Sequence, residues 1–200
     1  MCLAVLRARK RFGQNFLVDP GMIQKIIGSF NIRPGDHIVE IGPGRGALTQ
    51  PLYDDRCDLT LIEIDRDLGA ELSVRFPDAG LINEDVMTID FNRFAKQSLI
   101  RIIGNLPYNI STPLLFKLFD FGEHIQDMHF MLQREVVDRM TALPSTKAYG
   151  RLSVMTQLHC HTEKLFEVPP QAFSPRPKVQ SAIIRLTPNK KATDFDKKLL

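Results

Sequence analysis

Residues 39–47 read Val-Glu-Ile-Gly-Pro-Gly-Arg-Gly-Ala, an apolar run that passes into a glycine-rich loop. Glycine accepts positive φ and lets a ligand approach the backbone, so the loop suits a strand that turns into a helix. The loop fits the dinucleotide pattern GxGxxA from Gly42, and also the pattern of S-adenosylmethionine sites, in which an acid such as Glu40 precedes the glycines. The loop alone therefore indicates a nucleoside-containing cofactor, with a tight turn that binds nothing as the structural alternative.

Two further carboxylates follow the next apolar runs. Glu63 lies 21 residues after Gly42, where a carboxylate can accept hydrogen bonds from both hydroxyls of a ribose. Asp85 comes just after the third run and is placed to accept a hydrogen bond from an adenine amino group. Ligands of open α/β sheets bind beyond the carboxyl ends of the strands, so we expect these groups to meet there.

Apolar runs rich in Ile, Leu and Val alternate with helical patterns along the middle of the chain. Strands are expected at residues 37–41, 59–64, 81–83, 99–104 and 128–133. Helices are expected at residues 47–53, 67–76, 112–119 and 135–140, with others starting at Pro20, after the N-cap Asp19, and after Gly150. This alternation predicts a parallel sheet with right-handed crossovers. Residues 164–168 and 181–186 are expected to pair as an antiparallel hairpin at the sheet edge.

The composition excludes several classes of protein. The chain has 200 residues, 44% hydrophobic and 24% charged, which rules out wholesale disorder and leaves room for one substantial core. No stretch approaches the roughly 18 apolar residues of a membrane span, and the N-terminal order of apolar then basic residues is the reverse of a secretory signal. Cys2, Cys57 and Cys160 are widely spaced and odd in number, so we expect reduced thiols and a cytoplasmic protein.

Charge is distributed unevenly along the chain. Residues 1–33 hold six basic residues and one acidic residue, whereas residues 34–163 hold 12 basic and 19 acidic residues. Residues 164–200 are basic again, with eight basic and three acidic residues. If the two basic ends meet in space, they form a positive face that suits a polyanion. Solvated surface lysines and arginines are the alternative.

The most informative stretch is Asn105-Leu106-Pro107-Tyr108, which follows the fourth strand. An exocyclic amine on an aromatic base is a poor nucleophile, because its lone pair is delocalised into the ring. Two acceptors, the Asn105 side-chain oxygen and the Leu106 carbonyl, could bind its two N–H bonds and favour a pyramidal nitrogen. Pro107 stiffens this turn, and the Tyr108 ring can stack on the base. A plain Asn-x-Pro turn beside a core tyrosine is the alternative.

At this point the sequence resembles the small-subunit ribosomal RNA adenine N6,N6-dimethyltransferases. The resemblance extends over most of the chain and is carried by these segments: RFGQNFL (11–17), VEIGPGRGALT (39–49), LIEIDRDL (61–68), NEDV (83–86), GNLPYNISTPLLFKL (104–118), KAYGRLSVMTQ (147–157) and AFSPRPKVQSAIIRL (172–186). It implies a class I methyltransferase fold, Rossmann-like, with a mostly parallel seven-stranded sheet whose last strand is antiparallel. It also implies S-adenosylmethionine as the cofactor.

The resemblance assigns a role to individual residues. The cofactor-binding residues would be Asn15, Leu17, Gly42, Glu63, Asp85, Val86 and Asn105. The catalytic residues would be Asn105, Leu106, Pro107, Tyr108 and Phe173. Tyr108 and Phe173 would sandwich a flipped adenine, replacing the neighbours that the base loses when it leaves its stack. For Phe173, a residue that fills the core is the alternative.

The implied reaction is dimethylation of two adjacent adenines near the 3′ end of 16S rRNA. The expected partner is the small-subunit rRNA in an immature 30S particle. We expect the protein to be a monomer that binds no metal and no membrane. Residues 1–187 would form the methyltransferase domain, with a basic N-terminal arm at residues 1–18. Residues 188–200 would start a truncated helical domain that docks RNA.

Three other functions are open. An antibiotic-resistance methylase of large-subunit rRNA shares many motifs, but Leu106 and residues 147–157 point away from it. A ribosome-assembly factor could bind through the basic ends without catalysis. A nicotinamide dehydrogenase would tolerate the glycine loop, but it has no use for Asp85 or for the turn at Asn105.

Overall fold

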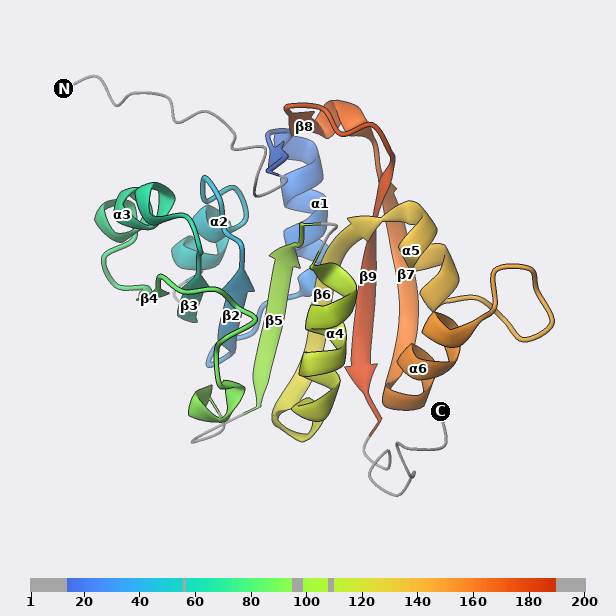
Figure 1. The fold of residues 1–200 in the computed structure, drawn as a ribbon. Coiled ribbons are helices and arrows are strands. Elements are labelled where there is room, and N and C mark those ends of the chain that lie inside the picture. Colours follow the sequence, from blue (N-terminus) through green and yellow to red (C-terminus); the bar gives the residue numbers. More distant parts are fainter. Residues whose placement is uncertain (1–13, 56, 95–98, 108–109, 190–200) are drawn as a thin grey trace.

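A seven-stranded sheet forms the centre of the protein in this computed structural model, which describes residues 14–55, 57–94, 99–107 and 110–189 (Figure 1). The strand order is β4-β3-β2-β5-β6-β9-β7. The strands are β2 (His37–Ile41), β3 (Asp58–Ile62), β4 (Gly80–Ile82), β5 (Ile100–Asn105), β6 (Ile125–Gln133), β7 (Cys160–Val168) and β9 (Ser181–Pro188). The pairs from β4 to β6 are parallel, and β9 pairs antiparallel with both β6 and β7. The predicted mostly parallel sheet with an antiparallel last strand is confirmed, and β9 lies inside the edge strand β7.

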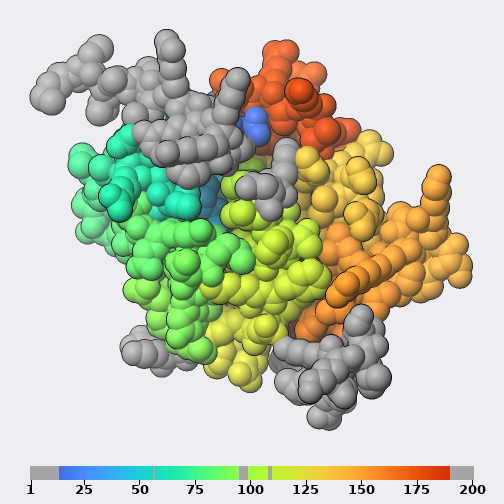
Figure 2. Space-filling model, in the orientation of Figure 1, coloured from blue at the N-terminus to red at the C-terminus, as the bar shows by residue number. Residues whose placement is uncertain are grey.

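Six helices cover the two faces of the sheet within the described residues. They are α1 (Pro20–Phe30), α2 (Thr49–Asp54), α3 (Arg66–Arg75), α4 (Ser111–Asp120), α5 (Arg134–Met140) and α6 (Arg151–His159). Three short 3₁₀ turns lie at Phe91–Phe94 (η2), Gly122–His124 (η3) and Pro170–Ala172 (η4). Side chains of α1, α2 and α3 join one apolar cluster, and those of α4, α5 and α6 join the other. Figure 2 shows the face formed by α4 to α6, behind which the strands are hidden.

The central strands β2 and β5 are largely apolar because both of their faces are buried. In β2, Ile38 packs into the cluster with α1 to α3, and its neighbour Val39 packs into the cluster with α4 to α6. Both side chains are fully buried. This two-sided burial is what makes parallel strands recognisable in the sequence as short continuous apolar runs.

A separate two-stranded ladder joins distant parts of the chain. Strand β1 (Phe16–Leu17) pairs antiparallel with β8 (Phe173–Ser174), and the Val18 N–H donates to the Ala172 carbonyl at 2.8 Å. The sequence patterns did not predict these strands, because two residues are too few to show a period. The ladder fixes the start of the described chain beside the loop that leads into β9.

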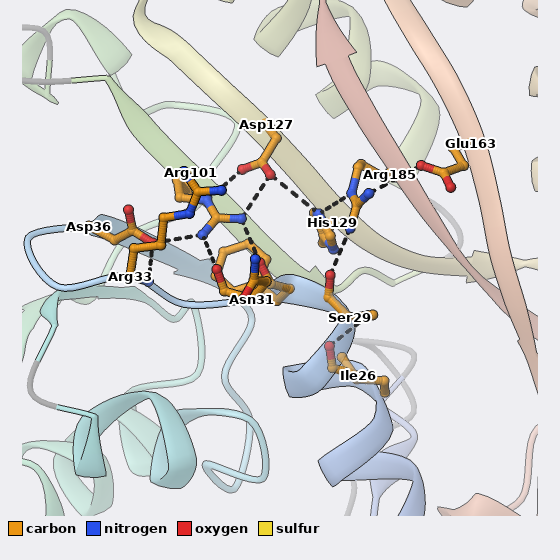
Figure 3. Close-up of polar contacts among 11 residues, drawn as sticks. Ile26, Ser29, Asn31, Arg33, Asp36, Arg101, Asp127, His129, Glu163 and Arg185 are labelled. Atoms are coloured by element: carbon orange, nitrogen blue, oxygen red, sulfur yellow. Dashed lines mark hydrogen bonds and ion pairs between the residues drawn. The ribbon is translucent and has the colours of Figure 1, made fainter.

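A buried guanidinium anchors the end of α1 to the sheet (Figure 3). Arg101 of β5 donates two hydrogen bonds to Asp127 of β6 and one to Asp36, at 2.7 to 2.8 Å. It also donates to the carbonyls of Phe30 and Asn31, which the helix end leaves without intrahelical donors. All five N–H groups of Arg101 are therefore used, and its side chain is almost fully buried.

Within the described part of the chain, no helix has the length and apolar character needed to cross a membrane.

Candidate active site

A pocket of about 280 Å³ lies at the carboxyl ends of β2, β3, β4 and β5. Its walls come from the start of the described chain, the glycine loop, the ends of the next three strands and the turn after β5. The lining residues are Gln14, Asn15, Phe16, Ile41, Gly42, Gly44, Ile62, Glu63, Ile64, Glu84, Asp85, Val86, Asn105, Leu106, Pro107 and Ile110. Glu63 and Asp85, which we expected to meet at this edge of the sheet, both line the pocket.

The glycine loop forms one wall with its backbone. Gly42 and Gly44 have φ values of 68° and 58°, a region that residues with a side chain rarely adopt. A Cβ atom on Gly44 would stand 3.1 Å from the Phe16 ring, which itself lines the pocket. The bare backbone therefore leaves room for a ligand that side chains would otherwise take.

Glu63 is held in place before any ligand binds. The backbone N–H groups of Gly44 and Asp65 donate to its two carboxylate oxygens at 3.1 and 2.9 Å. The Asn83 side chain donates to the Glu63 carbonyl at 2.6 Å, which ties the ends of β3 and β4 together. Burial raises the pKa of Glu63, and the two backbone donors oppose that rise. A carboxylate fixed in this way can accept hydrogen bonds from a diol without reorganising.

Asp85 stands in a turn that fixes its carboxylate. One oxygen accepts the backbone N–H of Met87 at 2.9 Å, and the Thr88 hydroxyl donates to the Asp85 carbonyl at 2.8 Å. The other carboxylate oxygen has no hydrogen-bond partner among the described residues. Asp85 also lines the pocket, so an acceptor is available there for an amino group.

The turn after β5 opens into the same pocket as the glycine loop. The Asn105 side-chain nitrogen donates to the Asn15 carbonyl at 2.9 Å, which leaves the side-chain oxygen as an acceptor. Asn105, Leu106 and Pro107 all line the pocket. The Leu106 N–H donates to the Met131 carbonyl of β6 at 3.3 Å, so its peptide is anchored to the neighbouring strand.

Two of the expected site residues stand away from the pocket. Leu17 and Phe173 are 6% and 3% exposed, belong to the apolar cluster with α1 to α3, and do not line the pocket. They face each other across the β1–β8 ladder. Tyr108 lies outside the described residues. The assignment of Tyr108 and Phe173 to a flipped base stays a prediction.

Several pocket residues were not anticipated from the sequence. Phe16 lines the pocket while Leu17 next to it is buried, as the alternation of a strand requires. The Arg45 guanidinium lies 4.5 Å from the centre of the Phe16 ring. Ile64, which is 44% exposed, and Ile110 add apolar wall. Ile64 could have been predicted to line the pocket, because it directly follows Glu63 in the sequence.

Glu40, the acid before the glycines, does not reach the pocket. It is buried behind the loop, and the Thr49 hydroxyl of α2 donates to it at 2.7 Å. Burial is the main cause that raises the pKa of Glu40 to about 8. The residue therefore supports the loop from behind and does not contact a ligand.

The pocket suits an adenosine-containing sulfonium compound. The glycine wall lets a ligand come close to the backbone. The fixed carboxylate of Glu63 suits the diol of a ribose, and the acceptor on Asp85 suits the amino group of an adenine. Among the described residues, no group of three or more His, Cys, Asp or Glu side chains could hold a metal ion. The sheet order and this pocket define a class I methyltransferase, with S-adenosylmethionine as its methyl donor.

The chain belongs to the ribosomal RNA adenine dimethylase family, whose sequence profile matches residues 5–199. It is 57% identical over 188 residues to the ribosomal RNA small subunit methyltransferase A of Acinetobacter baylyi, covering 92% of this chain and 69% of the relative. It is 56% identical over 183 residues to the protein of the same name from Legionella pneumophila, covering 90% and 71%.

Solved structures share the fold. A dimethyladenosine transferase from Plasmodium falciparum superposes with a TM-score of 0.79 at 31% identity, over 88% of this chain and 64% of that chain. The 23S rRNA methyltransferase ErmE superposes with a TM-score of 0.76 at 29% identity, over 88% of this chain and 70% of that one. The chain thus spans just under two thirds of the Plasmodium protein.

Proposed function

We propose that this protein transfers methyl groups from S-adenosylmethionine to N6 of two adjacent adenines near the 3′ end of small-subunit rRNA. The products are N6,N6-dimethyladenosines, made during ribosome biogenesis on an immature 30S particle by a monomeric enzyme. The observation that carries the proposal is that the glycine loop and the turn at Asn105 line one pocket. The names of the relatives at 56–57% identity support the choice of rRNA subunit.

The protein acts by holding groups in place. Glu63 and Asp85 hold the ribose and the adenine of the donor, and the Asn105 oxygen with the Leu106 carbonyl holds the two N–H bonds of the target amine. S-adenosylmethionine bound there would supply an electrophilic methyl group. The Asn105 oxygen and the Leu106 carbonyl would hold the N6 amine as its lone pair takes up that methyl group; the sulfur would keep the electron pair of the broken bond, and an N6 proton would pass to water. The two acceptors favour the reacting geometry over the planar amine. Tyr108 and Phe173 are assigned to the two faces of the base.

The test uses immature 30S particles that lack these methyl groups. The parent protein should add four methyl groups to the 3′ fragment of the small-subunit rRNA, as measured by mass spectrometry. Asn105→Ala should slow transfer by about 100-fold or more, because the target amine loses its acceptor. Its affinity for S-adenosylmethionine should fall by much less than the transfer rate, since Glu63 and Asp85 are intact and only the bond from Asn105 to the Asn15 carbonyl is lost from the donor pocket. Asn92→Ala, at an exposed position away from the pocket, is the matched control.

Three results would overturn the proposal. They are the absence of saturable S-adenosylmethionine binding, full activity in Asn105→Ala, or methylation at other positions only. Likeness to ErmE makes an adenine of large-subunit rRNA the second candidate. Offering both rRNAs in one reaction and mapping the methylated adenine distinguishes the two.

A further inference from the structure

A lysine of α4 reaches across to the segment that follows β4. The Lys117 ammonium donates to the carbonyls of Val86 and Met87 at 3.3 and 2.8 Å. Its nitrogen also lies 5.6 Å from the centre of the Phe91 ring. The side chain is partly buried, so these contacts are sheltered from water.

The two carbonyls belong to the wall of the pocket that carries Asp85. Val86 packs its side chain into the apolar cluster with α4, and Asp85 binds the Met87 N–H. The carbonyls of residues 86 and 87 lie outside the sheet, where no strand partner can satisfy them. Lys117 supplies a charged donor to both, and charge-assisted hydrogen bonds are stronger than neutral ones.

The helix that carries Lys117 also carries the other side of the pocket. Helix α4 begins at Ser111, and Ile110 just before it lines the pocket. Residues 105–107, a few positions earlier in the chain, also line the pocket. One side chain therefore fixes the distance between the segment around Asp85 and the helix that follows the target-binding turn.

We propose that Lys117 is a positioning residue for the adenine of the methyl donor. By holding the carbonyls of Val86 and Met87 against α4, it fixes the direction of the Asp85 carboxylate and so the selectivity for an amino group on the purine. This inference rests on the proposed function, in which Asp85 binds that amino group.

The test compares two ligands that differ only at the purine. S-adenosylhomocysteine carries the amino group, and its inosine analogue carries a carbonyl oxygen there. The parent protein should prefer the amino ligand, because the carbonyl would face the Asp85 acceptor. Lys117→Met should reduce this preference by about fivefold or more, as measured by titration calorimetry. It should raise KM for S-adenosylmethionine by a similar factor and leave kcat nearly unchanged, since the transferring groups are untouched.

Two further variants make the result specific. Lys117→Arg keeps a cation that can bind both carbonyls and should restore at least half of the preference. Lys147→Met removes an exposed lysine away from the pocket. It should leave the preference for the amino ligand and the KM for S-adenosylmethionine unchanged. If Lys117→Met does not fold, as judged by thermal unfolding, the preference of Lys117→Gln decides in its place.

Unchanged selectivity in a folded Lys117 variant would overturn this inference. The failure of the proposed function is visible separately, since a parent protein that binds S-adenosylhomocysteine but does not methylate rRNA would still show the purine preference. A parent that binds both ligands equally would refute the role of Asp85, and with it that of Lys117.

Discussion

Glu40 and Glu63 are both buried carboxylic acids beside the glycine loop, yet only Glu63 reaches the pocket. The backbone N–H groups of Gly44 and Asp65 hold Glu63 in a form that can accept hydrogen bonds from a ligand. Glu40 has one hydroxyl donor, from Thr49, and its burial favours the protonated acid. The same residue type therefore serves binding at one position and support of the backbone at the other.

The raised pKa of Glu40 predicts a pH-dependent stability. In the unfolded chain this group loses its proton near its ordinary value of 4.5, whereas in the folded protein it keeps the proton until about pH 8. The folded state binds more protons in between, so the stability that this group contributes is complete below pH 4.5 and is lost as pH rises toward 8. Glu40→Gln keeps an oxygen acceptor for Thr49 and should flatten this slope, by up to about 1.4 kcal/mol per pH unit.

Urea unfolding of both proteins at intervals between pH 5 and pH 8 gives the comparison. Parallel curves of unfolding free energy against pH would show that Glu40 is ionised in the folded protein at neutral pH. Thr49→Val is a useful companion, because it removes the hydroxyl donor while leaving the acid in place.

Replacement of Gly44 should disturb the pocket wall, because an added Cβ would crowd the Phe16 ring. Gly44→Ala adds a methyl group at φ 58°, where its Cβ would stand 3.1 Å from the Phe16 ring. We expect a stability loss of about 1–2 kcal/mol from the backbone alone, and a larger loss of S-adenosylmethionine affinity as Phe16 is displaced. Gly28→Ala is the control, because Gly28 lies in α1 and its added Cβ would meet no atom within 4 Å. Thermal unfolding and calorimetric titration measure the two effects.

At the scale of the element, α1 depends on a charge cluster at the start of β5, the end that lies away from the pocket. Arg101 is 4% exposed and binds Asp127, Asp36 and two carbonyls at the end of α1. Nearby, Arg185 of β9 donates to His129 and to the Ser29 carbonyl of α1 (Figure 3). The helix is therefore joined to β5, β6 and β9 by two side chains rather than by apolar packing alone.

Arg101→Leu should cost about 3–5 kcal/mol of unfolding free energy, because it leaves buried carboxylates without a cation. Burial raises the pKa of Asp127, but its polar contacts with His129 and with the Arg101 guanidinium outweigh that effect and lower the pKa to about 2. The contribution of Asp127 is therefore present above its ordinary pKa of 3.8 and is lost as pH falls toward 2. Denaturant unfolding of Arg101→Leu and of the double variant with Asp127→Leu checks the argument. A double variant no more stable than Arg101→Leu would contradict it.

The elements that the sequence predicted well are those with burial on both faces. Strand β2 was predicted at its observed bounds, His37–Ile41, because all its neighbours are strands and helices of the core. Strand β7 begins at Cys160 rather than at residue 164; the earlier start was not predicted because residues 161–163 are polar and exposed or half exposed and show no apolar run. The ladder of β1 and β8 depends on pairing across 150 residues of chain, which no local pattern reveals.

The candidate site was predictable for the same reason. Gly42, Glu63, Asp85 and Asn105 follow parallel strands, whose carboxyl ends meet at one edge of the sheet. Phe16 and the bond from Asn105 to the Asn15 carbonyl could not be predicted, because β1 lies outside that sheet. Their positions are set by tertiary contacts alone.

At the scale of the whole molecule, the unequal distribution of charge predicts how RNA is bound. The cluster Arg7, Arg9, Lys10 and Arg11 lies outside the described residues, and its sequence predicts an arm that contacts phosphates. Replacing all four by Ala should weaken binding to small-subunit rRNA and reduce the slope of log affinity against log salt by up to about four. S-adenosylmethionine affinity should not change. Filter binding across a salt series measures the slope.

The other basic end supplies the comparison. If residues 1–33 and 164–200 form one positive face, replacing Lys190, Lys191, Lys197 and Lys198 by Ala should reduce the same slope. A slope that neither replacement changes would show that the RNA is held by other surfaces.

Gln14, Asn15 and Phe16 line the pocket for the methyl donor. The ladder that begins at Phe16 joins only two residue pairs. The Asn105 amide donates to the Asn15 carbonyl, and the Gln14 amide donates to Asp65 at 3.4 Å. A ladder of two residue pairs is shorter than the pairing of β2, β5, β6 or β9 in the central sheet, so this segment is expected to open more easily than those strands. We expect this part of the pocket wall to open when the spent donor leaves between successive transfers, so that substitutions that lengthen or weaken the ladder would change the rate of product release.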